Sequence, residues 1–357
     1  MVFCFNSWSV GGDEQENQSG DDKYFTAPSR LDSGQQGSAS TSRNVDYMTS
    51  GVRNPNGIST TLRRFKLDEL SEATENFDES TKIGAGGFGS VHLGIIKRSE
   101  HPYDDIQVQR QWQTEVDFLG QIEHPNLVKL IGCCSEEHGN ESHWLLVYEY
   151  MPNRSLDYHL SGRSNTPLPW NTRLKIAQDA AIGLKYLHEG KGPGGQFIFR
   201  DFKPSNVLLD KDWNAKLSDC GFVREGPHDG RSHVSTLAVG TKGYAAPEYV
   251  QTGRLTFKSD VWSYGIFLVQ LMTGRPPPAQ KNSEIKHECM RWVCCCAGAG
   301  NSQRIIDPRL EGTYSKRSMD KISSVADKCL VKDHKSRPTM SEVLEMVNEA
   351  IALQHSP

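Results

Sequence analysis

The 357-residue sequence lacks any long run of apolar residues. Its longest apolar stretches, such as residues 144–148, fall far short of the roughly 20 residues that cross a bilayer. We therefore expect no transmembrane helix. The first ten residues, MVFCFNSWSV, also lack the basic start and the long apolar core of a signal peptide. These absences predict an intracellular, cytoplasmic protein.

An excess of positive charge is missing as well. The chain has 40 Lys and Arg residues against 44 Asp and Glu residues, which gives a formal net charge of −4. Proteins that bind nucleic acid by neutralising its phosphates usually carry a basic excess, so we expect no nucleic-acid partner. Nine cysteines are spread through this long chain. That distribution indicates reduced thiols rather than a disulfide framework.

Position 2 is valine instead of glycine, and this excludes N-myristoylation of that position. Cys4, between Phe3 and Phe5, is a candidate for palmitoylation, and an unmodified cysteine is the alternative. One acyl chain anchors a protein only marginally. The sequence therefore predicts at most a peripheral association with the plasma membrane through the N-terminus.

Apolar residues are sparse and without a period in the first 60 residues, of which 31 are Ser, Gly, Asn, Asp or Gln. This composition predicts a disordered tail over residues 1–60. From Phe65 the apolar spacing changes and predicts a flanking helix within residues 61–78. Folded structure is expected to begin there.

Strand patterns precede helix patterns in the folded region. Alternating residues around Val91 and the apolar run 143–151 predict strands. Residues 174–187 place apolar side chains on one helical face, with Asn171 as the expected N-cap and Gly190 past the end. A second apolar helix is predicted over residues 261–272. This order suits two lobes with a ligand-binding cleft between them.

The segment IGAGGFGSV, residues 83–91, places Gly84, Gly86 and Gly89 in a G-x-G-x-x-G pattern. Without side chains at these positions, backbone amides can approach phosphate oxygens closely. A dinucleotide-binding turn requires a helix directly after the glycines, whereas here a strand pattern follows. A glycine-rich hairpin over nucleotide phosphates fits better, with an ordinary glycine turn as the alternative.

Two further segments carry the residue types of phosphoryl transfer. FRDFKPSNVLL contains Asp201, Lys203 and Asn206, and KLSDCG supplies Asp219 at a distance of 18 residues from Asp201. The reaction uses a carboxylate to accept a hydroxyl proton, an amide and a second carboxylate to hold magnesium, and a cation near the transferred phosphate. A nucleotide phosphate and Mg²⁺ are therefore the expected ligands, and the resemblance described next implies that the nucleotide is ATP.

With GYAAPEY, SDVWSYG and KSRP following in that order, the sequence resembles the eukaryotic protein kinase family from about residue 65 to residue 353. ELSEATENFDES, HPNLVKLIG and LLVYEYMPNRSLDYHL are similar to plant receptor-like cytoplasmic kinases, which are related to the interleukin-receptor-associated kinases. The resemblance implies an α+β, bilobal kinase domain over residues 79–354. Its small antiparallel sheet lobe with one helix would span 79–150, and its mainly helical lobe 151–354.

The resemblance also implies roles for single residues. Asp201 would be the catalytic base, Lys203 would contact the transferred phosphate, and Asn206 and Asp219 would hold magnesium. Lys203 is also what the resemblance associates with serine/threonine specificity. The implied ATP-binding residues are Ile83, Gly84, Ala85, Gly86, Gly87, Gly89, Val91, Tyr148, Glu149 and Met151.

Outside the reaction centre, Glu115 would be the acidic residue of the small-lobe helix. Glu248, Arg337 and Asp260 are expected to stabilise the large lobe, the first two as a buried ion pair. The candidate activation-loop phosphosites are Ser235, Thr236 and Thr241. Ser235 or Thr236 is preferred, Thr241 suits substrate positioning better, and ordinary turn hydroxyls are the alternative.

These features together imply a serine/threonine kinase that transfers the ATP γ-phosphate to protein hydroxyls in receptor-proximal signalling of plant defence. Protein substrates and an upstream receptor kinase complex are the implied partners.

One departure from the kinase pattern concerns the segment between Val91 and Glu115, which is about a dozen residues shorter than the motif pattern requires. Ile106, Gln107 and Val108 look like the start of the third strand, but its V-A-[VI]-K lysine is missing.

In an ungapped alignment, Gln111 takes the place of that lysine, and a neutral amide cannot replace a cation beside phosphates. Lys97 and Arg110 are nearby cations with different geometries. The alternative function is a pseudokinase scaffold with impaired catalysis, and a misread exon would also explain the short segment. A second departure is Cys220, which replaces the aromatic residue of D-F-G and predicts a weakened packed column near Leu119.

Overall fold

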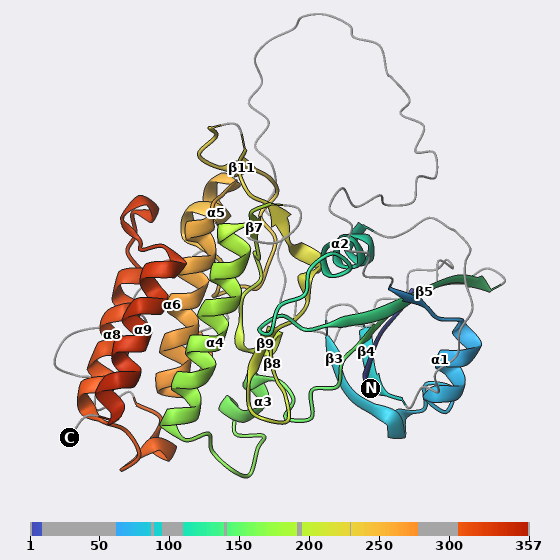
Figure 1. Cartoon of the computed structure of the whole chain (residues 1–357), viewed down its shortest axis with the longest axis horizontal. Helices are drawn as coiled ribbons and strands as arrows, with labels where there is room; N and C mark the ends of the chain where they lie inside the picture. The colour runs from blue at the N-terminus through green and yellow to red at the C-terminus, as the bar shows by residue number, and fades with distance from the viewer. Residues whose placement is uncertain are drawn as a thin grey trace, which may run out of the picture.

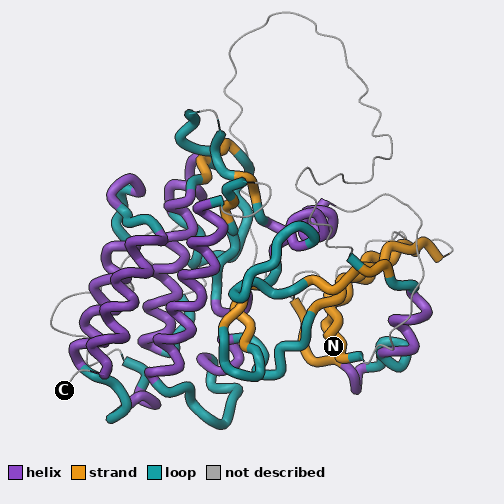
Figure 2. The backbone as a smooth tube through the Cα atoms, in the orientation of Figure 1, coloured by secondary structure: helices purple, strands orange, loops and turns teal. Residues whose placement is uncertain are grey.

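A strand-rich small lobe and a larger helical lobe make up the computed structural model, as Figures 1 and 2 show. The bilobal α+β fold expected from the sequence is confirmed. None of the described helices is long and apolar enough to span a membrane. The structure describes residues 2–8, 62–86, 89–94, 110–138, 141–190, 195–228, 230–277 and 306–355.

A six-stranded sheet with the order β2-β5-β6-β1-β4-β3 forms the small lobe. Neighbouring strands run antiparallel, except that β2 and β5 are parallel. The strands are β1 (Val2–Trp8), β2 (Arg63–Arg64), β3 (Lys82–Gly86), β4 (Gly89–Leu93), β5 (Leu130–His138) and β6 (Glu141–Tyr148). Leu145 and Val147 of β6 join one apolar cluster, whereas Leu146 and Tyr148 join the main core, as period-two alternation requires.

Two helices pack against this sheet. Helix α1 (Leu67–Ala73) buries Leu70 completely in the same cluster as Phe65. Helix α2 (Arg110–Leu119) buries Trp112, whose indole Nε1 donates a hydrogen bond to the Leu145 carbonyl oxygen over 3.1 Å. The first turn of α2 therefore has a fixed position against the centre of β6.

The large lobe is organised around α6, which is buried from Ser259 to Thr273. A helix that is buried on all sides has to be apolar on all sides, and the sequence of α6 fits this requirement. Gly190 and Gly274 end α4 and α6 in the left-handed conformation that favours glycine. The helices are α3 (Leu156–Leu160), α4 (Trp170–Glu189), α5 (Pro247–Thr252), α6 (Phe257–Thr273), α8 (Lys316–Cys329) and α9 (Met340–His355).

Short strand pairs and 3-10 turns occur in the connections between the larger elements. Strand β8 pairs with β9, β7 with β10, and β11 with β12. The strands are β7 (Phe197–Ile198), β8 (Val207–Leu209), β9 (Ala215–Leu217), β10 (Arg224–Glu225), β11 (Val234–Ser235) and β12 (Arg254–Leu255). The 3-10 turns are η1 (Glu79–Thr81), η2 (Pro204–Asn206), η3 (Cys220–Phe222), η5 (Pro308–Leu310) and η6 (His334–Ser336).

The structure corrects two expectations about elements and agrees with a third. Residues 2–8, assigned to a disordered tail, form β1, because Val, Phe and Trp favour strands and because partners exist on both sides. The short flanking helix expected within 61–78 is present as the seven residues of α1. Helix α4 begins one residue before Asn171, so Pro169 stands at the N-cap. The remainder of the expected tail, residues 9–60, lies outside the described residues.

Candidate functional site

The segment that carries Asp201 is anchored from the large lobe. Arg200 has a φ of +74°, which costs free energy in a residue other than glycine. Asp260 of α6 is fully buried and accepts hydrogen bonds from the backbone N–H groups of Phe199 at 2.8 Å and Arg200 at 2.9 Å. His188 Nε2 lies 2.8 Å from the same carboxylate. Asp260 thereby stabilises the conformation that presents Asp201.

Around Asp201 the structure brings together the residues that the sequence predicted. Lys203 Nζ donates to Asp201 Oδ2 and to Thr241 Oγ1, each over 2.7 Å. Thr241 donates its hydroxyl proton to Asp201 Oδ1 over 2.6 Å. Asn206 Nδ2 donates to the Asp201 carbonyl oxygen at 2.9 Å. With both oxygens engaged, the 1% exposed Asp201 carboxylate has a defined orientation.

Asp219 lies at the start of η3, beside this cluster. Its φ of +63° places it in the left-handed region, and the Ser218 N–H before it donates to the Asn206 carbonyl oxygen at 2.9 Å. Burial raises the pKa of Asp219 well above its ordinary value, and the charges of Glu115 and Asp201 raise it further against the opposing effect of Lys203. Its buried Oδ1 has no hydrogen-bond partner in the described structure.

An oxygen in this position fits a divalent metal. A buried carboxylate oxygen without a partner is costly unless a cation or donor binds it. Magnesium is commonly held by one or two carboxylates together with water and substrate phosphates, so a complete protein cage is not required. Among the described residues there is no cluster of three or more His, Cys, Asp or Glu side chains suited to hold a metal.

Glu115 of α2 reaches the same region from the small lobe. Its Oε1 accepts hydrogen bonds from the Tyr148 hydroxyl and from the backbone N–H of Cys220, the latter over 3.2 Å. Burial raises the pKa of Glu115, and these two donors partly offset the effect. Among the described residues no Lys or Arg forms an ion pair with it. Tyr148 thus links the central sheet to α2 and η3.

The glycine-rich segment forms a hairpin. Gly86 pairs with Gly89 and Ala85 with Ser90 in the β3–β4 ladder, so a strand follows the glycines where a dinucleotide-binding turn would require a helix. Gly84 is opposite Val91, and the Ile83 side chain is exposed. Gly87 lies outside the described residues.

After β6, the segment 149–151 offers two free backbone groups. The Glu149 N–H donates to the Lys129 carbonyl oxygen, and the Met151 carbonyl oxygen accepts from the Arg154 N–H. The Glu149 carbonyl and the Met151 N–H have no partner in the part of the chain that the structure describes. An acceptor and a donor two residues apart match the hydrogen-bonding edge of adenine.

Glu248 and Arg337 form the ion pair suggested by the sequence. Both guanidinium Nη atoms lie 2.8 Å from the two carboxylate oxygens, and the Arg337 side chain has no exposed area. Arg337 also donates to the carbonyl oxygens of Val331 and Lys258. It joins α5, α6 and the segment before α9, and so stabilises the large lobe.

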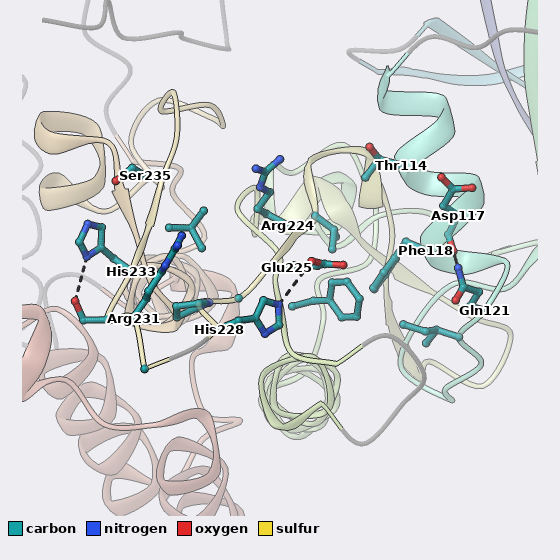
Figure 3. A pocket seen from close by; sticks show the side chains of 18 residues that line it. Thr114, Asp117, Phe118, Gln121, Arg224, Glu225, His228, Arg231, His233 and Ser235 are labelled. Carbon is teal, nitrogen blue, oxygen red and sulfur yellow. Dashed lines mark hydrogen bonds and ion pairs between the residues drawn. The ribbon is translucent and has the colours of Figure 1, made fainter. Parts of the chain in front are cut away.

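The three candidate phosphosites have different surroundings. Thr241 contacts Asp201 and Lys203 directly, as described above. Thr236 is half-buried, and its N–H donates to the Gly253 carbonyl oxygen. Ser235 is exposed and lines a cavity of about 1120 Å³ between α2 and residues 223–235. Figure 3 shows Arg224, Arg231 and His233 around this cavity, opposite Asp117 of α2.

Sequence reasoning missed the contact between Tyr148 and Glu115 and the bond from Thr241 to Asp201. Spacing alone cannot show them, because they join residues 33 and 40 positions apart. Gln111, aligned with a strand lysine, instead lies in the first turn of α2. Cys220 is fully buried and belongs to the main core together with Leu119. Lys97 and residues 106–108 are outside the described segments.

Comparison with known proteins agrees with this geometry. Residues 77–347 match the model of the protein kinase domain. The serine/threonine-protein kinase PCRK1 of Arabidopsis thaliana is 48% identical over 356 residues, covering 96% of this chain and 82% of the relative. PCRK2 of the same plant is 50% identical, covering 88% and 76%.

A third relative comes from Gossypium barbadense. This EPD1-interacting receptor-like cytoplasmic serine/threonine-protein kinase 5A is 43% identical and covers 87% of this chain and 70% of its own length. The chain therefore belongs to the protein kinase family and, within it, to the serine/threonine kinases of the plant receptor-like cytoplasmic type.

Proposed function

We propose that this chain transfers the γ-phosphate of magnesium ATP to Ser or Thr hydroxyls of protein substrates, with Asp201 as the catalytic base. The observation that carries the proposal is the hydrogen-bonded cluster of Asp201, Lys203 and Thr241 beside the unpartnered Oδ1 of Asp219. It combines a proton acceptor, a cation and a metal-binding oxygen within one small region.

The Thr241 hydroxyl indicates how a substrate would be oriented. It donates to Asp201 Oδ1 over 2.6 Å, which is the hydrogen bond that a substrate hydroxyl has to make before it gives up its proton. Lys203 contacts both Thr241 and Asp201, so its ammonium group is placed to neutralise charge on the transferred phosphate. Thr241 therefore acts as a positioning residue for the substrate.

Asn206 and Asp219 would hold the magnesium ion, which supplies charge neutralisation for the phosphates when bound. The Asn206 amide nitrogen already donates to Asp201, which directs its carbonyl oxygen away from that residue. The Glu149 carbonyl and the Met151 N–H would bind adenine, and the β3–β4 hairpin would cover the phosphates.

Phosphate incorporation by the chain as written, compared with an Asp201→Asn variant, tests this function. We expect magnesium-dependent incorporation into a generic Ser/Thr substrate, and at least a hundredfold less with the variant, because general-base catalysis contributes about 10²–10⁴-fold. ATP-induced thermal stabilisation is measured in parallel. Equal incorporation by both proteins would contradict the assignment of Asp201.

A pseudokinase scaffold is the second candidate function, and the surroundings of Glu115 favour it. Its described partners are a tyrosine hydroxyl and a backbone N–H, whereas active kinases pair the helix glutamate with the phosphate-binding lysine. The same assay separates the two functions. Stabilisation by magnesium ATP without incorporation above the Asp201→Asn level would support the scaffold.

For regulation, we propose Ser235 as the phosphosite. It is exposed, lies on the cavity with Arg224 and Arg231, and a phosphate there would gain charge-assisted hydrogen bonds. Arg200 is directed to the same loop, since its Nη2 donates to the Leu237 carbonyl oxygen at 3.0 Å. An upstream receptor kinase complex is the proposed source of the phosphate.

Peripheral association with the plasma membrane through an acylated Cys4 is a separate proposal.

A further inference from the structure

The N-terminal strand β1 occupies the centre of the small-lobe sheet, although it lies outside the matched kinase domain of residues 77–347. It pairs antiparallel with β6 along its whole length, from Val2 opposite Tyr148 to Trp8 opposite Ser142. On its other side, Val2, Phe3 and Cys4 pair with Leu93, His92 and Val91 of β4. Both edges of this strand are therefore used.

The sheet order places β1 between the two halves of the small-lobe sheet. Among the described strands, β4 has only β3 and β1 as neighbours, and β6 has only β1 and β5. Within the described sheet, the glycine-rich hairpin β3–β4 is thus connected to β5–β6 through β1 alone. Without β1, two strands would expose unpaired backbone groups, which is costly and invites aggregation.

We propose that residues 2–8 act in cis as the central strand of the small lobe, and that their insertion is what fixes the glycine-rich hairpin beside β6. Through its two partner strands, β1 is paired with residues of the candidate site. Val2 is opposite Tyr148, whose hydroxyl holds Glu115, and Cys4 is opposite Val91 of the hairpin.

Strand β1 completes the backbone pairing of the sheet, but it does not supply the phosphate-binding lysine that a kinase normally carries on a strand of this sheet. Its sequence, VFCFNSW, contains no Lys or Arg. In this chain, the strand that completes the sheet is therefore not a strand that binds phosphate through a lysine. The proposal concerns the order of the small lobe and does not depend on whether the protein transfers phosphate.

Hydrogen exchange on the full chain tests the proposal. A deletion of residues 2–9 is compared with a deletion of residues 33–40, which removes the same length from the Ser-Gly-Gln segment. We expect amides of β4 and β6 to exchange at least tenfold faster only in the first variant, while amides of α4 and α6 stay unchanged. A synthetic peptide of residues 1–10 should restore the protection.

Unchanged exchange in β4 and β6 after deletion of residues 2–9 would overturn the proposal, since another segment would then fill this position. If the deletion variant does not fold, the Phe3→Pro variant replaces it, because Phe3 is paired in both ladders and proline removes its backbone donor. The Ser38→Pro variant is its control. Protection retained in the Phe3→Pro variant would also overturn the proposal.

A disulfide test distinguishes insertion in cis from exchange between two copies. In the Val91→Cys variant, the new thiol is placed directly opposite Cys4 in the register, whereas in His92→Cys it is on the other face of the sheet. We expect a disulfide between Cys4 and the thiol introduced by Val91→Cys within one chain, found by mass spectrometry after mild oxidation, and none in the control. A disulfide between two chains would show a strand supplied by a second copy and overturn insertion in cis.

Discussion

At the scale of single residues, the candidate site places several carboxylates together with little compensating charge. Asp219 and Glu115 are both buried, and each has a raised pKa because burial disfavours the ionised form. Such an arrangement reduces stability in order to keep a binding site ready for a cation. The effect of each buried carboxylate on stability can be tested by removing one charge at a time.

The Asp219→Asn variant should be more stable than the original chain at pH 7 when metal is absent. The native pKa of Asp219 lies above its ordinary value of 3.8, so the native state binds the extra proton and its stability falls as pH rises through the interval between these values. Thermal unfolding from pH 4 to pH 8 in EDTA should show a smaller decline for the variant, by a few degrees. Magnesium ATP should stabilise only the original chain, and a parallel pH dependence of both would contradict this reasoning.

The Tyr148→Phe variant should lose about 1–3 kcal/mol of unfolding free energy, because the buried Glu115 carboxylate loses a donor. Urea unfolding measures the loss. Tyr150→Phe is the matched control, since the Tyr150 side chain is 42% exposed and should tolerate the change within about 0.5 kcal/mol. Equal stability of the two variants would mean that the hydroxyl of Tyr148 contributes nothing.

At the scale of elements, close packing of α6 against the end of α8 depends on a glycine. A Cβ atom added at Gly265 would lie 2.7 Å from Leu330 Cγ and 2.8 Å from Cys329 Cβ. The helices can approach this closely only where no side chain intervenes. Gly183 of α4 is a milder case, with the nearest atoms at 3.0–3.2 Å.

The Gly265→Ala variant should therefore be destabilised by about 1–3 kcal/mol, although alanine favours a helix interior by about 1 kcal/mol. The steric overlap decides the sign because it involves the Cβ of Cys329 and the branched carbon of Leu330. Gly183→Ala should cost less in the same urea titration. A Gly265→Ala variant as stable as the original would show that α8 moves away without cost.

Elements with a strong local pattern were predictable from the sequence. The apolar faces of α4 and α6, their glycine ends and the hairpin before Val91 follow from periodicity and turn chemistry. The pairing of β1 was not predictable, because its partners β4 and β6 are far along the chain and a seven-residue strand has no local signal for them. Composition of the whole tail obscured this short apolar stretch.

The same limit applied to the candidate site. Motif order identified Asp201, Lys203, Asn206 and Asp219, and the structure brings them into one region. Contacts between distant segments, such as Tyr148 with Glu115, depend on how the lobes pack. They were accessible only from the three-dimensional arrangement.

At the scale of the whole molecule, the two lobes differ in how their backbone hydrogen bonds are made. The large-lobe helices make their backbone hydrogen bonds within their own segments, although α4 packs against α9 and α6 against α8, which are distant in sequence. The small lobe pairs the first residues of the chain with residues 91–93 and 142–148. Loop closure over such distances slows folding.

Pulse-labelled hydrogen exchange during refolding should therefore show protection of α4 and α6 amides before that of β4 and β6 amides. The physical reason is that the backbone hydrogen bonds of α4 and α6 form within each helix, whereas those of β4 and β6 toward β1 form only when β1 pairs. In the variant lacking residues 2–9, the late phase in β4 and β6 should disappear while the early phase keeps its rate. Simultaneous protection of all four elements would contradict the expected order.

The central position of β1 also separates the order of synthesis from the order of assembly. Residues 2–8 are synthesised well before their longest partner, β6, which is complete only after residue 148 has been added. A growing chain halted before that point carries an apolar N-terminal segment without its main pairing edge. Residues 2–8 must therefore stay available for pairing throughout translation of the small lobe.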